Sequence, residues 1–121
     1  MKTVLLIEDD HWLADSYART LTRSGCAVVR VDSAERAMQA VEESAPDCIV
    51  ADIMLEGHTI FVLLHELQSY DDTRQIPVII CSNLTHDAVA AERLHHYGVV
   101  RVLDKATVTP DSLELAVKDV L

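Results

Sequence analysis

The chain has 121 residues, half of them apolar, which suits one domain with a sizeable core and disfavours two domains. Its formal net charge of −10 opposes binding to a nucleic-acid backbone, because such binding needs a clustered excess of Lys and Arg. No apolar run is long enough to cross a membrane, and three widely separated cysteines, Cys26, Cys48 and Cys81, indicate free thiols in a reducing, cytoplasmic setting.

Five short apolar runs rich in β-branched residues predict strands that are buried on both faces. In chain order these runs are residues 4–7, 27–31, 48–51, 78–81 and 99–103. Each run is followed by an amphipathic stretch in which apolar residues recur at helical spacing. The apolar helical positions are Leu13, Tyr17 and Leu21; Ala34, Ala37, Met38 and Val41; Ile60, Leu63, Leu64 and Leu67; Val89 and Leu94; and Leu113, Ala116, Val117 and Val120.

The residues at the boundaries of these stretches agree with five helices. The boundary residues are Ser33, Thr85 and Thr109 as N-caps, Pro110 in a first helical turn, and Gly25 and Gly98 after helix ends. A strand followed by a helix, repeated five times, predicts a parallel sheet, because parallel neighbours need crossover connections. We therefore expect an α/β fold, a (βα)5 doubly wound three-layer sandwich, forming one domain over residues 1–121 with no output domain in this chain.

Functional residues of such a fold gather beyond the carboxyl ends of the strands. The polar residues at those ends are Glu8, Asp9 and Asp10 after the first strand, Asp52 after the third, Ser82 after the fourth and Lys105 after the fifth. Two carboxylates about 4 Å apart repel by roughly 4 kcal/mol at an effective dielectric constant of about 20, so three that converge need a cation or a bound proton. Mg²⁺ fits this need because it prefers oxygen ligands.

A carboxylate beside such an ion can attack a phosphoryl donor and form an aspartyl phosphate. In that reaction Lys105 would neutralise charge on the transferred oxygens, and Ser82 would donate a hydrogen bond to one of them. Asp52, at the end of an apolar strand and opposite other acids, is the expected acceptor.

At this point four segments resemble the receiver domain of two-component response regulators across nearly the whole chain. Residues 4–10 resemble the family's first strand and acidic pair, and residues 46–55 its phosphoacceptor strand. Residues 76–82 are similar to its switch-hydroxyl segment, and residues 102–105 to its lysine segment. Four motifs in the right order are specific, although each alone is weak. The resemblance implies a flavodoxin-like fold with strand order 2-1-3-4-5.

The resemblance also implies a division of labour in the site. The acidic pair is taken as Glu8 and Asp9, because Leu13 stands four residues after Asp9, where the family has its first helical core residue; Asp10 is then a helix N-cap. The implied Mg²⁺ ligands are Asp9 and Asp52 directly, Glu8 through water, and the backbone carbonyl of Met54. The implied phosphoryl contacts are the backbone amides of Ile53 and Asn83, together with the catalytic side chains Asp52, Ser82 and Lys105.

The chain departs from the family pattern at both loops that flank the expected site. After Asp52, Glu56 and Ile60 stand in place of the usual Pro and Gly, and Glu56 is expected to be a solvated loop carboxylate. Ala106 replaces the proline that usually follows the lysine in a cis bond. Because a non-proline cis bond costs about 3 kcal/mol, we expect a trans bond and a differently shaped loop there.

Further departures concern how a phosphorylated state would be read and how long it would last. Val102 replaces the usual aromatic ring, so the family's aromatic readout cannot operate in its usual form. Asn83 replaces a customary alanine. Met54 and Leu84 hold the two positions that most influence phosphoryl lifetime, and neither can orient an attacking water. A comparatively long-lived phosphoryl state is therefore expected.

The function implied by the resemblance is that of a phosphoacceptor domain in a two-component phosphorelay. Its phosphoryl donor would be a sensor histidine kinase, a phosphotransfer protein or a small phosphodonor, and its output an attached domain or protein target. It would be a signalling domain that catalyses its own phosphorylation and dephosphorylation rather than an enzyme. A homodimer through the fourth and fifth helices is an assembly that this interpretation allows, and no direct contact with nucleic acid or membrane is expected.

Two other functions compete with this interpretation. The departures motivate a pseudo-receiver, a protein-binding module that is not phosphorylated, but the joint presence of Glu8, Asp9, Asp52, Ser82 and Lys105 argues against it. A phosphatase of the haloacid-dehalogenase type also uses an aspartyl phosphate, a hydroxyl and a lysine. The acidic run after the first strand does not match that class, and the chain has no room for its cap. Cys81 is expected to pack in the core, and Trp12 and Tyr17 are expected to pack rather than to bind a ligand.

Overall fold

The computed structural model describes residues 1–55, 58–83 and 88–121, and side chains outside 54–59 and 84–91. Its main sheet has five parallel strands in the order β2-β1-β3-β6-β7. These strands are β1 Thr3–Ile7, β2 Ala27–Val31, β3 Cys48–Ala51, β6 Val78–Ser82 and β7 Val99–Asp104. Because β6 and β7 are the fourth and fifth strands of this sheet along the chain, the predicted α/β fold and strand order are confirmed.

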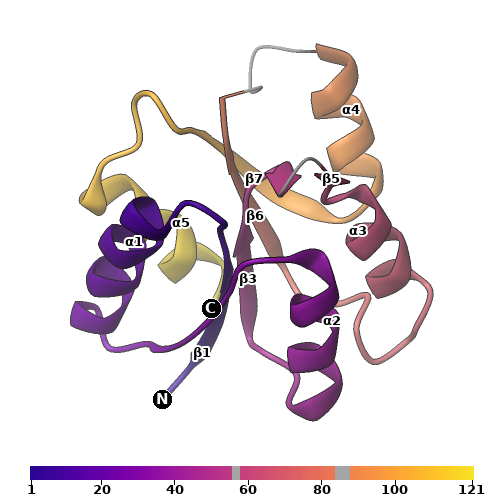
Figure 1. Ribbon diagram of the computed structural model, residues 1–121, viewed down its shortest axis with the longest axis horizontal. Coiled ribbons are helices and arrows are strands. Elements are labelled where there is room, and N and C mark those ends of the chain that lie inside the picture. The colour runs from indigo at the N-terminus through magenta and orange to yellow at the C-terminus, as the bar shows by residue number, and fades with distance from the viewer. Residues whose placement is uncertain (56–57, 84–87) are drawn as a thin grey trace.

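Helices cover both faces of the sheet (Figure 1). Their bounds are α1 His11–Arg23, α2 Ala34–Glu43, α3 Phe61–Gln68, α4 Ala88–His96 and α5 Pro110–Val120. Helices α1 and α5 pack together on one face, while α2 and α3 lie side by side on the other. None of the helices in the described ranges is both long enough and apolar enough to cross a bilayer.

The core consists of two apolar layers, one on each face of the sheet. Successive residues of β1 alternate between them: Leu5 and Ile7 pack with α2 and α3, whereas Val4 and Leu6 pack with α1 and α5. The central strands β1, β3 and β6 are therefore buried on both faces, as their continuous apolar runs predict.

The same prediction is wrong for the two edge strands. Much of β2 is partly or fully exposed, including Val29, and Val100 of β7 is also exposed. Apolar content alone does not reveal strand order, and a strand at the edge of a sheet has a neighbour on one side only. The strand order 2-1-3-4-5 implied by the family resemblance, unlike apolar content, does place the second and fifth strands at the edges.

Helix boundaries follow the cap residues expected from the sequence. The Asp10 side chain accepts hydrogen bonds from the backbone of Trp12 and Leu13 at the start of α1, at 3.0 and 3.2 Å. Ser33 caps α2 in the same way, and Thr109 forms a reciprocal capping box with Ser112 at the start of α5. The expected cap Thr85 lies outside the described residues.

A two-stranded antiparallel hairpin, β4 Met54–Leu55 and β5 His58–Thr59, follows the third strand of the main sheet. This hairpin was not expected from the sequence. The backbone N–H of Ile60 donates to the carbonyl of Ile53 at 2.7 Å, which joins the base of the hairpin to the start of α3. Along the chain, the hairpin thus lies between Asp52 and α3.

The three residues expected to pack differ in their burial. Tyr17 and Cys81 are buried, as predicted. Trp12 is not, because its side chain is 83% exposed. It stands at the second residue of α1, outside the buried face of that helix, so the expectation for Trp12 was wrong.

Candidate functional site

The residues that follow the strands are held in place by the sheet itself. Their backbone N–H groups continue the ladders between neighbouring strands, which fixes where each side chain begins. The hydrogen bonds run from Glu8 to the carbonyl of Val31 (3.1 Å), from Asp52 to Ile7 (3.3 Å) and from Lys105 to Ser82 (3.2 Å). These residues follow β1, β3 and β7 respectively, so side chains far apart in sequence meet at one edge of the sheet.

Lys105 lies at the centre of this group. Its Nζ is 2.7 Å from an Asp52 carboxylate oxygen and 2.9 Å from a Glu8 carboxylate oxygen. Burial alone would lower the pKa of Lys105, but the bonds to Asp52 and Glu8 outweigh it and raise the pKa above its ordinary value. The amine therefore stays positively charged between the two carboxylates.

Glu8 is the most deeply buried acid of the site, with its side chain 2% exposed. Burial raises its pKa, while hydrogen bonds from Lys105 and from the backbone N–H of Asp10 lower it by less. The Asp10 N–H lies 3.2 Å from Glu8 Oε1. Asp10 therefore uses its side chain to cap α1 and its backbone to hold Glu8, which agrees with the expected N-cap role.

Three carboxylates converge on one point. Glu8, Asp9 and Asp52 each offer an oxygen, and these oxygens lie within 4.8 Å of one another. Oxygen donors from several carboxylates are the ligand set that a hard divalent cation such as Mg²⁺ takes. The described residues at this position thus fit a metal ion by the chemistry of their donors.

The remaining expected site residues lie around this group. Ser82 is buried at the end of β6, and Asn83 beyond it is exposed. Ile53 follows Asp52 with its side chain in the core, and Met54 begins the hairpin strand β4. Glu56 and Leu84 lie outside the described residues, as does the Met54 side chain, so the expected phosphoryl lifetime stays a prediction.

The loop after Lys105 is a turn built by Asp104. Its carboxylate accepts from the N–H of Ala106 at 2.9 Å, and its carbonyl accepts from Thr107 and Val108 at 3.1 and 2.8 Å. There is no cis peptide bond in the described ranges, in agreement with the trans bond expected at Ala106. This Asp104 turn, which was not expected from the sequence, fixes the backbone after Lys105.

Val102 is partly buried against the core layer beneath α2, α3 and α4. An aromatic cluster lies on the same side, where the Phe61 and Tyr97 rings are 5.8 Å apart and the Arg93 guanidinium lies 4.0 Å from the Phe61 ring centre. Rings are thus present between α3 and the end of α4, although none stands at position 102.

Comparison with known proteins identifies the family to which the chain belongs. The family model of the response regulator receiver domain matches residues 4–118. The transcriptional regulatory protein AfsQ1 of Streptomyces coelicolor is 33% identical over 87 residues, which cover 72% of this chain and 37% of AfsQ1. The chain spans less than half the length of the curated relatives it matches.

Solved structures agree at the level of the fold. A candidate response regulator from Chloroflexus aurantiacus superposes with a TM-score of 0.87 at 25% identity, covering 98% of this chain and 96% of that one. The receiver domain of a histidine kinase from Syntrophus aciditrophicus gives a TM-score of 0.88 at 23% identity, covering 100% and 90% of the two chains.

The parallel sheet with its acidic group at the carboxyl ends defines a flavodoxin-like α/β domain. The chain belongs to the response regulator receiver domain family of two-component systems. Receiver domains of this family interact with histidine kinases and with output domains, and the curated relatives include transcriptional regulators.

Proposed function

We propose that this receiver domain accepts a phosphoryl group on Asp52, in a Mg²⁺-dependent transfer from a phosphohistidine of a partner protein or from a small phosphodonor. The observation that carries the proposal is the placement of Lys105, bonded at once to Asp52 and Glu8 within the acidic group. An ordinary surface ion pair joins one lysine to one acid and is exposed to solvent. The side chain of Lys105 is only 11% exposed and contacts two acids.

In the proposed reaction an Asp52 carboxylate oxygen attacks the phosphorus of the donor. The new oxygen–phosphorus bond forms as the bond to the donor breaks, and the donor leaves with that electron pair. Lys105 is positioned to neutralise charge on the transferred oxygens. The Ser82 hydroxyl and the backbone N–H groups of Ile53 and Asn83 are proposed to donate hydrogen bonds to the same oxygens.

Asp9 and Asp52 are proposed to hold Mg²⁺ directly, with Glu8 acting through water and the carbonyl of Met54 as a further ligand. When bound, the ion would neutralise negative charge on the carboxylates and on the phosphoryl group. Glu8 already contacts Lys105, so its proposed part is to orient that amine as well as to contribute charge to the metal site.

The experiment is the intact mass of the protein after incubation with phosphoramidate, in Mg²⁺ and in EDTA. We expect one added phosphoryl group on the parent in Mg²⁺ and none in EDTA. Asp52→Asn should gain none, whereas the matched control Asp72→Asn, an exposed acid, should label like the parent. Lys105→Met should slow labelling by about 100-fold, because the transferred oxygens lose their fixed positive charge.

Two results would contradict the proposal. A gain of phosphoryl mass by the Asp52→Asn variant would show that Asp52 is not the acceptor. A parent that gains no phosphoryl mass in Mg²⁺ would instead favour the protein-binding module that is not phosphorylated.

A further inference from the structure

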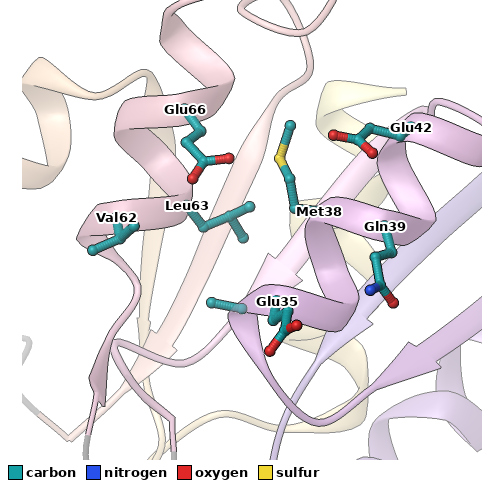
Figure 2. Close-up of a pocket in the computed structure, with 8 residues that line it drawn as sticks. Glu35, Met38, Gln39, Glu42, Val62, Leu63 and Glu66 are labelled. Atoms are coloured by element: carbon teal, nitrogen blue, oxygen red, sulfur yellow. The ribbon is translucent and has the colours of Figure 1, made fainter.

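A groove runs between α2 and α3, on the face of the sheet opposite α1 and α5. Its volume is ≈ 380 Å³. Figure 2 shows Met38 and Leu63 between the two helices, with Glu42 and Glu66 on either side of them. No residue of the acidic site lines this groove, so it is a separate feature of the surface.

The groove joins apolar contact area to negative charge. Met38 is partly buried and Val62 on α3 is 66% exposed, so both offer apolar surface at the groove. Three acids, Glu35, Glu42 and Glu66, line the same groove, and no lysine or arginine of the described part of the chain does. Among the described residues none of these three acids forms an ion pair, although most of the chain's cations do.

The acids are spaced to match a helix. Glu35, Met38 and Glu42 stand at positions i, i+3 and i+7 of α2, which places them along one stripe. Seven residues of helix rise about 10.5 Å, so Glu35 and Glu42 mark two points about two turns apart. Glu66 faces this stripe from α3 (Figure 2). A helix lying along the groove could contact Glu35 and Glu42 with two of its own residues that are about two turns apart.

We propose that the α2–α3 groove is a docking surface for a basic amphipathic helix of a partner protein. Its apolar stripe would cover Val62 and the exposed part of Met38, and its Lys or Arg residues would pair with Glu35, Glu42 and Glu66. Charge complementarity selects this occupant, because uncompensated carboxylates repel an acidic segment and attract a basic one. The inference does not depend on phosphorylation of Asp52.

The test uses a fluorescein-labelled lysine–leucine peptide of about 18 residues, long enough to form a helix, with lysines two turns apart on the flanks of its leucine stripe. The fluorescence anisotropy of the peptide is measured while the parent chain, or one of four variants, is added in increasing amounts. Glu42→Lys should weaken binding by about tenfold, whereas Glu43→Lys, with the same charge change on the same helix but outside the groove, should weaken it by less than about twofold.

The apolar part of the groove has its own matched pair. Val62→Asp should weaken peptide binding by about fivefold, and Leu115→Asp, at an exposed leucine of α5, should leave binding unchanged. Circular dichroism of each variant checks that it is folded.

Several outcomes would overturn the inference. These are no binding of the peptide to the parent, equal weakening by Glu42→Lys and Glu43→Lys, or equal weakening by Val62→Asp and Leu115→Asp. The equal effects would show attraction by net charge or by scattered apolar side chains. Self-association of the parent that Val62→Asp abolishes would identify a second copy as the occupant and also reject the proposal.

Discussion

The Tyr17 hydroxyl is buried beneath the site and has no hydrogen-bond partner among the described residues. Burial, with smaller effects of neighbouring charges, raises the pKa of Tyr17 to about 12. The hydroxyl is thus neutral and desolvated, and a buried polar group left unsatisfied costs about 1 to 3 kcal/mol. The ring, by contrast, packs between α1 and the sheet with Cys81.

Tyr17→Phe should therefore raise the free energy of unfolding by about 1 kcal/mol, because it removes the unsatisfied hydroxyl and keeps the ring. Urea denaturation followed by circular dichroism measures this change. A fall in stability would show instead that the hydroxyl is satisfied in solution.

Glu8 allows a prediction about pH. Burial raises its pKa above the ordinary value of 4.5 in the folded chain. At pH values between 4.5 and the raised pKa of the folded chain, the folded chain binds more protons at Glu8 than the unfolded chain does. The contribution of Glu8 to stability therefore falls as pH rises through this range. Glu8→Gln removes this dependence.

The difference in unfolding free energy, parent minus Glu8→Gln, should therefore decrease as pH rises from 4.5 through the folded pKa. Urea titrations at a series of pH values in EDTA measure this difference free of metal. If the difference grows over that range, the attraction of Lys105 outweighs burial and the pKa of Glu8 is lowered.

At the scale of elements, two glycines that follow helices differ in what surrounds them. Gly25 and Gly98 both have positive φ, at 96° and 80°. A Cβ at Gly25 would meet nothing within 4 Å, whereas one at Gly98 would lie 2.5 Å from Nε2 of Gln68. That amide donates hydrogen bonds to the carbonyls of Tyr97 and Arg74 and so connects the end of α3 to the end of α4.

Gly25→Ala should cost about 1 to 2 kcal/mol of stability through backbone strain alone. Gly98→Ala should cost about 1 to 2 kcal/mol more, because Gln68 must move and give up its hydrogen bonds. Thermal or urea unfolding measures both costs. The excess at Gly98 should shrink in a Gln68→Ala background, and an unchanged excess would show that Gln68 is not its cause.

The elements also show how far sequence reasoning reached. Strands, helices and caps were predictable because periodicity and cap residues are local signals, as Ser33 and Thr109 illustrate. The β4–β5 hairpin was missed because strands of two residues have no measurable period. The exposure of Trp12 was missed because a large apolar ring favours packing, although position 12 stands outside the apolar stripe predicted for this helix.

At the scale of the whole molecule, the candidate site was predictable because parallel strands bring their carboxyl ends to one edge. That rule places Glu8, Asp52 and Lys105 close together, although Asp52 is 44 residues after Glu8 (52 − 8) and Lys105 is 53 residues after Asp52 (105 − 52). It does not give side-chain partners. The pairing of Lys105 with both acids is seen only in the structure, and the sequence offers only an Asp before the lysine as a signal for the turn that follows it.

The groove between α2 and α3 belongs to this scale as well. Its apolar positions, Met38 and Leu63, were predicted as core residues of separate helices, and both are more buried than Val62 beside them. Only the packing of α2 against α3 shows that they share a surface with three acids.

The central claim is that Asp52 is the phosphoryl acceptor. An acyl phosphate is reduced by borohydride to the alcohol, so a phosphorylated aspartate becomes homoserine, and tandem mass spectrometry of peptides locates it. After treatment with phosphoramidate and Mg²⁺, the account predicts homoserine at position 52 and at no other aspartate. Homoserine at Asp9 or Asp10, or its absence from a chain that has gained phosphoryl mass, would contradict it.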